Sequence, residues 1–183
     1  MLSRLLSALL WVGSCQQPSG PILLVHFDRA FAGSVRCAQE ASTMARAFDE
    51  VIVLTKGDGP WEGSTTLVAV SPTKVVPSGS GEHELAVSGP RATVAGGYFR
   101  ACFSNAVRLL LRNTDHPITL VVPTKAVYFG DARTLYEQFV DNFRGDREGF
   151  EDYVRGVAVQ QWGLEPGRFT VALEGSVLTI AER

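Results

Sequence analysis

The 183-residue sequence has no excess of positive charge and no run of basic residues. Lysine and arginine total 17 against 19 acidic residues, which gives a net charge of −2 at pH 7. Proteins that bind nucleic acids neutralise the phosphates with clustered lysine and arginine side chains. The charge balance therefore predicts that nucleic acid is not a partner of this protein.

Cysteine and histidine are also scarce, with three of each in the chain. They are Cys15, Cys37 and Cys102, and His26, His83 and His116. None of them has the CxxC, HxH or HxxxH spacing by which short segments bind zinc. The glycine-containing loops at 55–59 and 79–83 lack the GxGxxG and GxxxxGK spacings that hold phosphate. The sequence therefore predicts no disulfide framework, no metal site of these types and no cofactor.

The apolar run at residues 5–12 is too short for a bilayer, which needs about 20 residues, so we expect no transmembrane anchor. The first 15 residues hold one arginine and no acid. Three interpretations stay open: a retained N-terminal helix, a mitochondrial targeting segment, and a bacterial lipoprotein signal with a lipidated Cys15 and a periplasmic protein. We favour a retained segment and a mitochondrial location. Residues 1–19 would be this leader with a linker, and residues 20–183 a single α/β domain.

Short apolar runs alternate with segments of helical periodicity along the rest of the chain. Strands are predicted at 21–27, 50–56, 65–70, 92–97 and 118–124, helices at 34–48, 102–111 and 132–143, and an exposed loop at 71–84. A further helix is predicted at 148–163, followed by two short strands that turn at Glu174-Gly175. This order predicts a three-layer α/β sandwich with a mainly parallel sheet and a short C-terminal β-hairpin.

Ligands of parallel α/β sheets bind beyond the carboxyl ends of the strands. Those ends here are at residues 26–31, 56–59 and 96–102, and Lys74 would join them from the middle loop. Cys102 is placed where a helix begins after a strand, near the positive end of the helix dipole, which favours a reactive thiolate. Cysteine is also often buried in a core as a small apolar side chain, and this structural role for Cys102 stays open.

The segment from Gly96 to Cys102, with an apolar strand before it and a helix after it, resembles the nucleophile segment of the isochorismatase-like cysteine hydrolases. A buried strand at 118–123 follows that helix, as it does in this family. The first strand, ILLVH, with Phe31 five residues past His26, is also similar to the first strand of the family. The resemblance covers roughly residues 20–145 and implies an isochorismatase-like fold.

The family resemblance implies a catalytic Asp, Lys and Cys that cleave C–N bonds in amide substrates. Cys102 matches the nucleophile, and Lys74 is the candidate lysine. His26 occupies the position of the Asp, and Asp28 would take that role after a shift of two residues. A Cys/His pair is also a competent nucleophile and base. Lys125 departs from the family, whose corresponding strand ends in Asp-Ala.

These observations lead to two hypotheses about the function of the protein. We favour a non-catalytic isochorismatase-like scaffold, a structural or interaction subunit that other protein subunits hold in a larger complex, with a mitochondrial membrane as its setting. Two features favour loss of catalysis: His26 occupies the position of the catalytic Asp, and the loop that holds Lys74 is shorter than the corresponding passage of the family. Two more favour contacts with other subunits, because the N-terminal leader and the C-terminal hairpin would each offer a neighbour a surface to bind. The alternative is an active cysteine hydrolase on a small amide substrate. An active site must gather its side chains around a pocket, whereas a scaffold can fill that space with Phe27, Tyr98 and Phe99.

Overall fold

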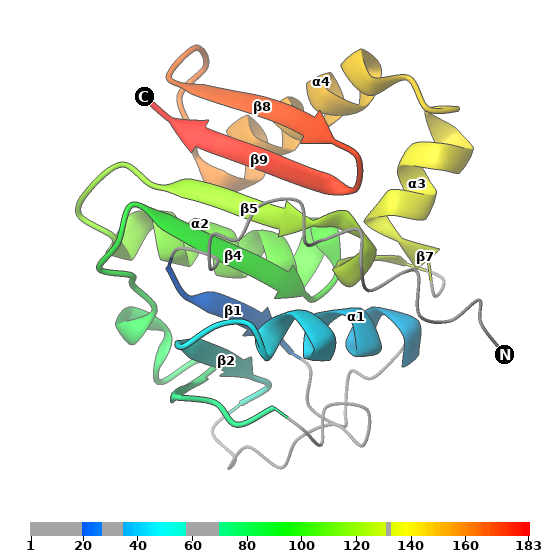
Figure 1. The fold of residues 1–183 in the computed structure, drawn as a ribbon. Coiled ribbons are helices and arrows are strands. Elements are labelled where there is room, and N and C mark those ends of the chain that lie inside the picture. The colour runs from blue at the N-terminus through cyan, green and yellow to red at the C-terminus, as the bar shows by residue number, and fades with distance from the viewer. Residues whose placement is uncertain (1–19, 27–34, 58–69, 131–132) are drawn as a thin grey trace, which may run out of the picture.

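The computed structural model describes residues 20–26, 35–57, 70–130 and 133–183 of the chain. Its centre is a seven-stranded sheet with the strand order β3-β2-β1-β4-β5-β9-β8 (Figure 1). The first five are parallel: β1 (Ile22–Val25), β2 (Val51–Thr55), β3 (Lys74–Pro77), β4 (Arg91–Gly96) and β5 (Thr119–Pro123). The last two, β8 (Phe169–Glu174) and β9 (Val177–Glu182), are antiparallel.

Helices lie on both faces of this sheet (Figure 1). One face packs against α1 (Val35–Ala45), and the other against α2 (Ser104–Asn113), α4 (Arg147–Val157) and the π-helical turn η5 (Ala158–Trp162). Every residue of β1 and β2 is buried, as expected for parallel strands that are covered on both sides. The predicted α/β class with a mainly parallel sheet is confirmed, and the flanking helices agree with a three-layer sandwich.

The C-terminal hairpin is also confirmed, because β8 and β9 pair in an antiparallel register and turn at Glu174-Gly175. Gly175 has a φ of 60°, which glycine adopts without a side-chain clash. The hairpin joins the parallel part of the sheet through β9, which pairs with β5. The described part of the chain contains no helix whose length and apolar character would let it cross a membrane.

Two predicted elements need correction. The exposed loop at 71–84 contains the edge strand β3 and the short 3-10 helix η2 (Glu82–Glu84). An edge strand tolerates Pro77 at its last position, because one side of the strand has no partner to bond. The helix predicted from Cys102 is preceded by a π-helical turn, η3 (Phe99–Phe103), and α2 begins at Ser104.

The other helices follow the prediction with shorter bounds. The helix predicted at 132–143 is α3 (Leu135–Asn142), where Thr134 and Glu137 form a capping box. The helix predicted at 148–163 is α4 continued by η5. The leader at 1–19 lies outside the described residues, as do residues 65–69 of the strand predicted at 65–70.

Candidate functional site

The carboxyl ends of β1 and β4 meet at the centre of the sheet, where the strand order reverses. Val25, the last residue of β1, pairs with Gly96, the last residue of β4. His26 and Gly97 therefore follow at adjacent strand ends. This reversal is where open α/β sheets most often bind ligands. Asp28 is outside the described residues.

Gly97 lets the chain turn tightly at the end of β4. Its φ is 65°, and a Cβ at this position would lie 2.9 Å from Val25 Cγ1, 3.0 Å from Phe103 N and 3.1 Å from Cys102 Sγ. Any side chain would have to displace one of these atoms or distort the turn. Because Gly97 lacks a side chain, Cys102 packs directly over the strand end and beside Val25.

Cys102 is half-buried in η3, and its Sγ accepts a hydrogen bond from the backbone N–H of Tyr98 at 3.0 Å. Neither Cys102 nor Cys37 forms a disulfide. They pack against different faces of the sheet, since Cys102 contacts the core on the α2 side and Cys37 belongs to the core under α1.

His26 turns the chain at the end of β1. It is 9% exposed, its φ is 51°, and its backbone N–H donates to the carbonyl oxygen of Leu54 at 2.8 Å. Histidine is among the few side chains other than glycine that are enriched in this left-handed region. Of the residues predicted for the site, the structure brings His26 and Cys102 to neighbouring strand ends.

Lys74 lies elsewhere. It is the first residue of β3 and pairs with Ile52 near the start of β2, so it sits at the amino ends of the parallel strands. β3 is three strands from β4 in the sheet, a separation of roughly 14 Å at the usual strand spacing. The Nζ atom donates to the carbonyl oxygen of Glu84 at 2.8 Å and lies 3.8 Å from the carboxylate of that residue. The structure does not bring Lys74 to Cys102.

Aromatic side chains hold η3 in place. Phe99 is 1% exposed and packs edge-on against Trp162, with 6.1 Å between ring centroids. Trp162 Nε1 donates to Ser104 Oγ at 2.8 Å, and Ser104 Oγ donates to the carbonyl oxygen of Phe99 at 2.6 Å. Tyr98 packs against Tyr128 with centroids 5.5 Å apart. Tyr98 and Phe99 therefore pack against the body of the domain, while Phe27 lies outside the described residues.

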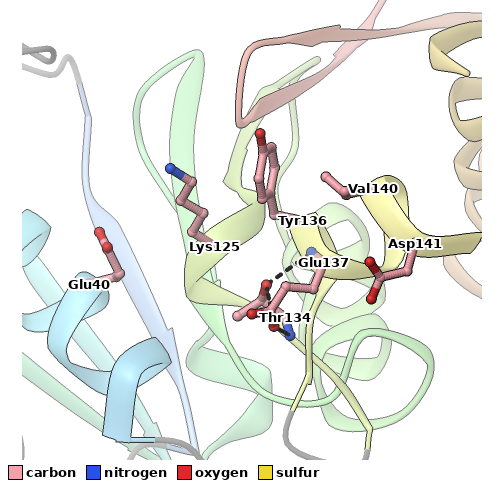
Figure 2. Close-up of a pocket in the computed structure, with 7 residues that line it drawn as sticks. All are labelled: Glu40, Lys125, Thr134, Tyr136, Glu137, Val140 and Asp141. Atoms are coloured by element: carbon pink, nitrogen blue, oxygen red, sulfur yellow. Dashed lines mark hydrogen bonds between the residues drawn. The ribbon is translucent and has the colours of Figure 1, made fainter. Parts of the chain in front are cut away.

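A cavity of about 360 Å³ opens beyond the carboxyl end of β5 (Figure 2). It lies among α1, the turn η4 (Thr124–Ala126), the short strand β7 (Arg133–Thr134) and α3. Its lining residues are Glu40, Lys125, Thr134, Tyr136, Glu137, Val140 and Asp141. The sequence carries little signal for this cavity, because Lys125 stands out only as a departure from the family pattern at the end of a predicted strand.

Beneath this cavity lies the core cluster that contains Cys37, Ala126 and Tyr128. Burial raises the pKa of the Cys37 thiol far above its usual range, and the nearby Glu40 and Glu137 raise it further. A hydrogen bond with Tyr128 acts in the opposite direction. Cys37 is therefore a protonated, structural thiol at neutral pH.

No group of three or more His, Cys, Asp or Glu side chains suited to a metal ion occurs among the described residues. No protein-family model matches the sequence, and no curated protein matches it.

Proposed function

We propose that the protein is a non-catalytic scaffold of isochorismatase-like type and acts as a structural or interaction subunit of a larger protein complex. The observation that carries the proposal is the position of Lys74, which lies across the sheet from Cys102 and is held by Glu84. A nucleophile needs a base and a charge-supporting partner within a few ångströms. Lys74 does not supply such a partner to Cys102. The acid-free apolar leader leads us to place the complex at a mitochondrial membrane.

The order of elements around Cys102 supports the isochorismatase-like part of the proposal. β4 ends at Gly96, Cys102 follows six residues later, and α2 begins two residues after that. β5 then returns parallel to β4. These are the features on which the family resemblance rests, and here they occur in one continuous segment with the expected strand pairing.

The hairpin β8–β9 supports a role in protein contacts. Its core face packs on α4, so the alternate residues of β5, β9 and β8 face the other way. They form three cross-strand rows: Thr119–Ala181–Thr170, Val121–Thr179–Ala172 and Pro123–Val177–Glu174. We call these nine residues the hairpin face. It carries one charged side chain, and its two buried members, Val121 and Pro123, are both on β5. The members on β8 and β9 are exposed or half-buried and no described helix covers them (Figure 1), so an uncharged surface of a partner subunit would fit them.

The geometry of Cys102 also favours a second candidate, an active cysteine hydrolase on a small amide substrate. The N–H of Tyr98 points at Sγ, and His26 follows the adjacent strand end. In that case Cys102 would be the nucleophile and His26 or Asp28 the base, with another cation in place of Lys74.

Alkylation of Cys102 distinguishes the two candidates. The rate of reaction with iodoacetamide would be measured from about pH 5 to pH 9 by mass spectrometry of the Cys102 peptide, because the chain has other thiols. The variants are His26→Asn, which tolerates the left-handed backbone, and Lys74→Ala. For a scaffold we expect slow labelling that is the same in all three proteins. Fast labelling below pH 7 that slows in His26→Asn would identify the hydrolase instead.

A further inference from the structure

The cavity beyond β5 has an exposed apolar wall on α3. Val140 is 45% exposed there, and Tyr136 lies on the same helix and also lines the cavity (Figure 2). An apolar group of a ligand would shield both side chains from water. The volume of the cavity, about 360 Å³, is within the range of small-molecule sites, roughly 300 to 1,000 Å³. Its position at the carboxyl edge of the parallel strands is also the usual one for ligands of such sheets.

Two of the charged groups around the cavity are engaged within the protein. Asp141 lies 3.8 Å from the guanidinium of Arg133. Glu137 caps α3, because its carboxylate accepts from the N–H of Thr134 at 2.8 Å and from the hydroxyl of that residue at 3.1 Å, and it has a further interaction in the protein. We therefore assign neither carboxylate to a ligand.

Lys125 and Glu40 differ from these groups, because both are exposed and neither has an ion pair. Across the described ranges, neither comes within ion-pair distance of an opposite charge. The ammonium of Lys125 lies over the ring of Tyr136, 5.0 Å from its centroid, and extends towards the side of the cavity that Glu40 borders (Figure 2). A ligand between Lys125 and Glu40 can therefore bind both groups without breaking an existing ion pair.

These two groups select a ligand that carries both signs of charge. A ligand with a carboxylate alone would bind Lys125 but would bring a like charge towards Glu40. A ligand with an ammonium alone would bind Glu40 but would bring a like charge towards Lys125. A zwitterion pairs with both groups and avoids both repulsions.

We propose that this cavity binds an α-amino acid with an apolar side chain. Lys125 would bind the α-carboxylate, Glu40 would bind the α-ammonium, and Val140 and Tyr136 would pack against the apolar side chain. The inference does not rest on the proposed scaffold function, because it uses none of the residues around Cys102 or on the hairpin face.

Calorimetric titration of the full chain with L-leucine and three analogues tests the proposal. Isocaproate lacks only the ammonium of leucine, isoamylamine lacks only the carboxylate, and glycine keeps both charges but has no side chain. We expect saturable binding of L-leucine and about tenfold weaker binding of each analogue, because each analogue loses one of the three contacts.

Two variants assign the contacts of the charged groups. Lys125→Met should lower the affinity for L-leucine about tenfold without weakening the binding of isoamylamine, because the amine has no group for Lys125. Glu40→Gln should lower the affinity for L-leucine by a similar factor without weakening the binding of isocaproate.

Matched controls change the same charges elsewhere. Arg112→Met at the end of α2 and Glu174→Gln on β8 are exposed substitutions away from the cavity and should leave all of these affinities unchanged. Three results would overturn the proposal: no saturable binding of L-leucine, binding of the analogues as tight as that of L-leucine, or a Lys125→Met variant that loses L-leucine and isoamylamine alike. None of these results bears on the labelling of Cys102, which tests the scaffold function separately.

Discussion

Gly97 is the residue on which the end of β4 depends. In Gly97→Ala, the new methyl group would meet Val25, Cys102 and the backbone of Phe103 within about 3 Å, at a φ of 65°. The left-handed backbone and the overpacking together should lower the free energy of unfolding by about 2–4 kcal/mol. Urea denaturation monitored by circular dichroism measures this loss.

Gly130→Ala is the control for Gly97→Ala. Gly130 also has a positive φ, 96°, but a Cβ there would have no other atom within 4 Å. This variant should lose about 1–2 kcal/mol from backbone strain alone. If the two variants lost equal stability, the close packing of Cys102 over Gly97 would contribute nothing, and the account of that contact would be wrong.

Cys102 and Lys74 show which parts of the candidate site a sequence pattern can predict and which it cannot. The spacing from Gly96 predicts that Cys102 opens a helix after a strand, whereas in the structure Cys102 lies in the turn η3 and α2 begins at Ser104. No residue pattern could place Lys74, because its distance from Cys102 depends on which edge of the sheet its strand joins. In the structure that strand is β3, and Lys74 lies at its amino end.

The hairpin β8–β9 is the element that carries most of the hairpin face, which has a single charged side chain. Ala172→Arg would place a long cation in the middle row of the hairpin face, beside Thr179. A buried, unpaired charge costs several kcal/mol in an interface, so we expect the complex to dissociate. The measurement is the native mass of the protein extracted from its own cells, against 19.8 kDa for the single chain.

Ala86→Arg provides the matched control for this element. Ala86 is exposed in the loop after η2, near the opposite edge of the sheet, so the same charge should leave the assembly intact. Migration of the wild type as a single chain would contradict the proposed subunit role. Retention of Ala172→Arg in the complex would show that the partner binds another surface.

The elements themselves were predictable where the local pattern is strong. Continuous apolar runs identified β1, β2, β4 and β5, and alternation with a Glu-Gly turn identified the hairpin. β3 was missed because Pro77 and the nearby glycines indicate a loop, and one of its four residues, Val76, is buried. Such a short strand is stabilised by its pairing with β2, which is a tertiary contact.

For the whole molecule, Cys37 links folding stability to pH. Its pKa is raised in the folded state, mainly by burial, and is about 8.5 in an unfolded chain. Below that pH both states hold the proton, so the stabilising effect of burial on the protonated thiol is complete. As the pH rises further, the unfolded state loses its proton and the folded state keeps it. The free energy of unfolding should then fall by up to about 1.4 kcal/mol per pH unit.

Urea unfolding under reducing conditions at several pH values above 8 measures this slope. Other thiols and tyrosines also titrate there, so the comparison is with Cys37→Ala, whose slope should be shallower by the contribution of one thiol. Parallel curves for the two proteins would mean that Cys37 ionises in the folded state as easily as in the unfolded one.

The sequence by itself determined the α/β class, the buried parallel strands and the C-terminal hairpin. These follow from hydrophobic periodicity and turn residues, which act between neighbours in the chain. The tertiary structure decided the strand order, the separation of Lys74 from Cys102, and the cavity that gathers Glu40, Lys125 and Tyr136 from three elements. The physical reason is that charged side chains meet across space according to strand pairing and helix packing, and no local pattern encodes those contacts.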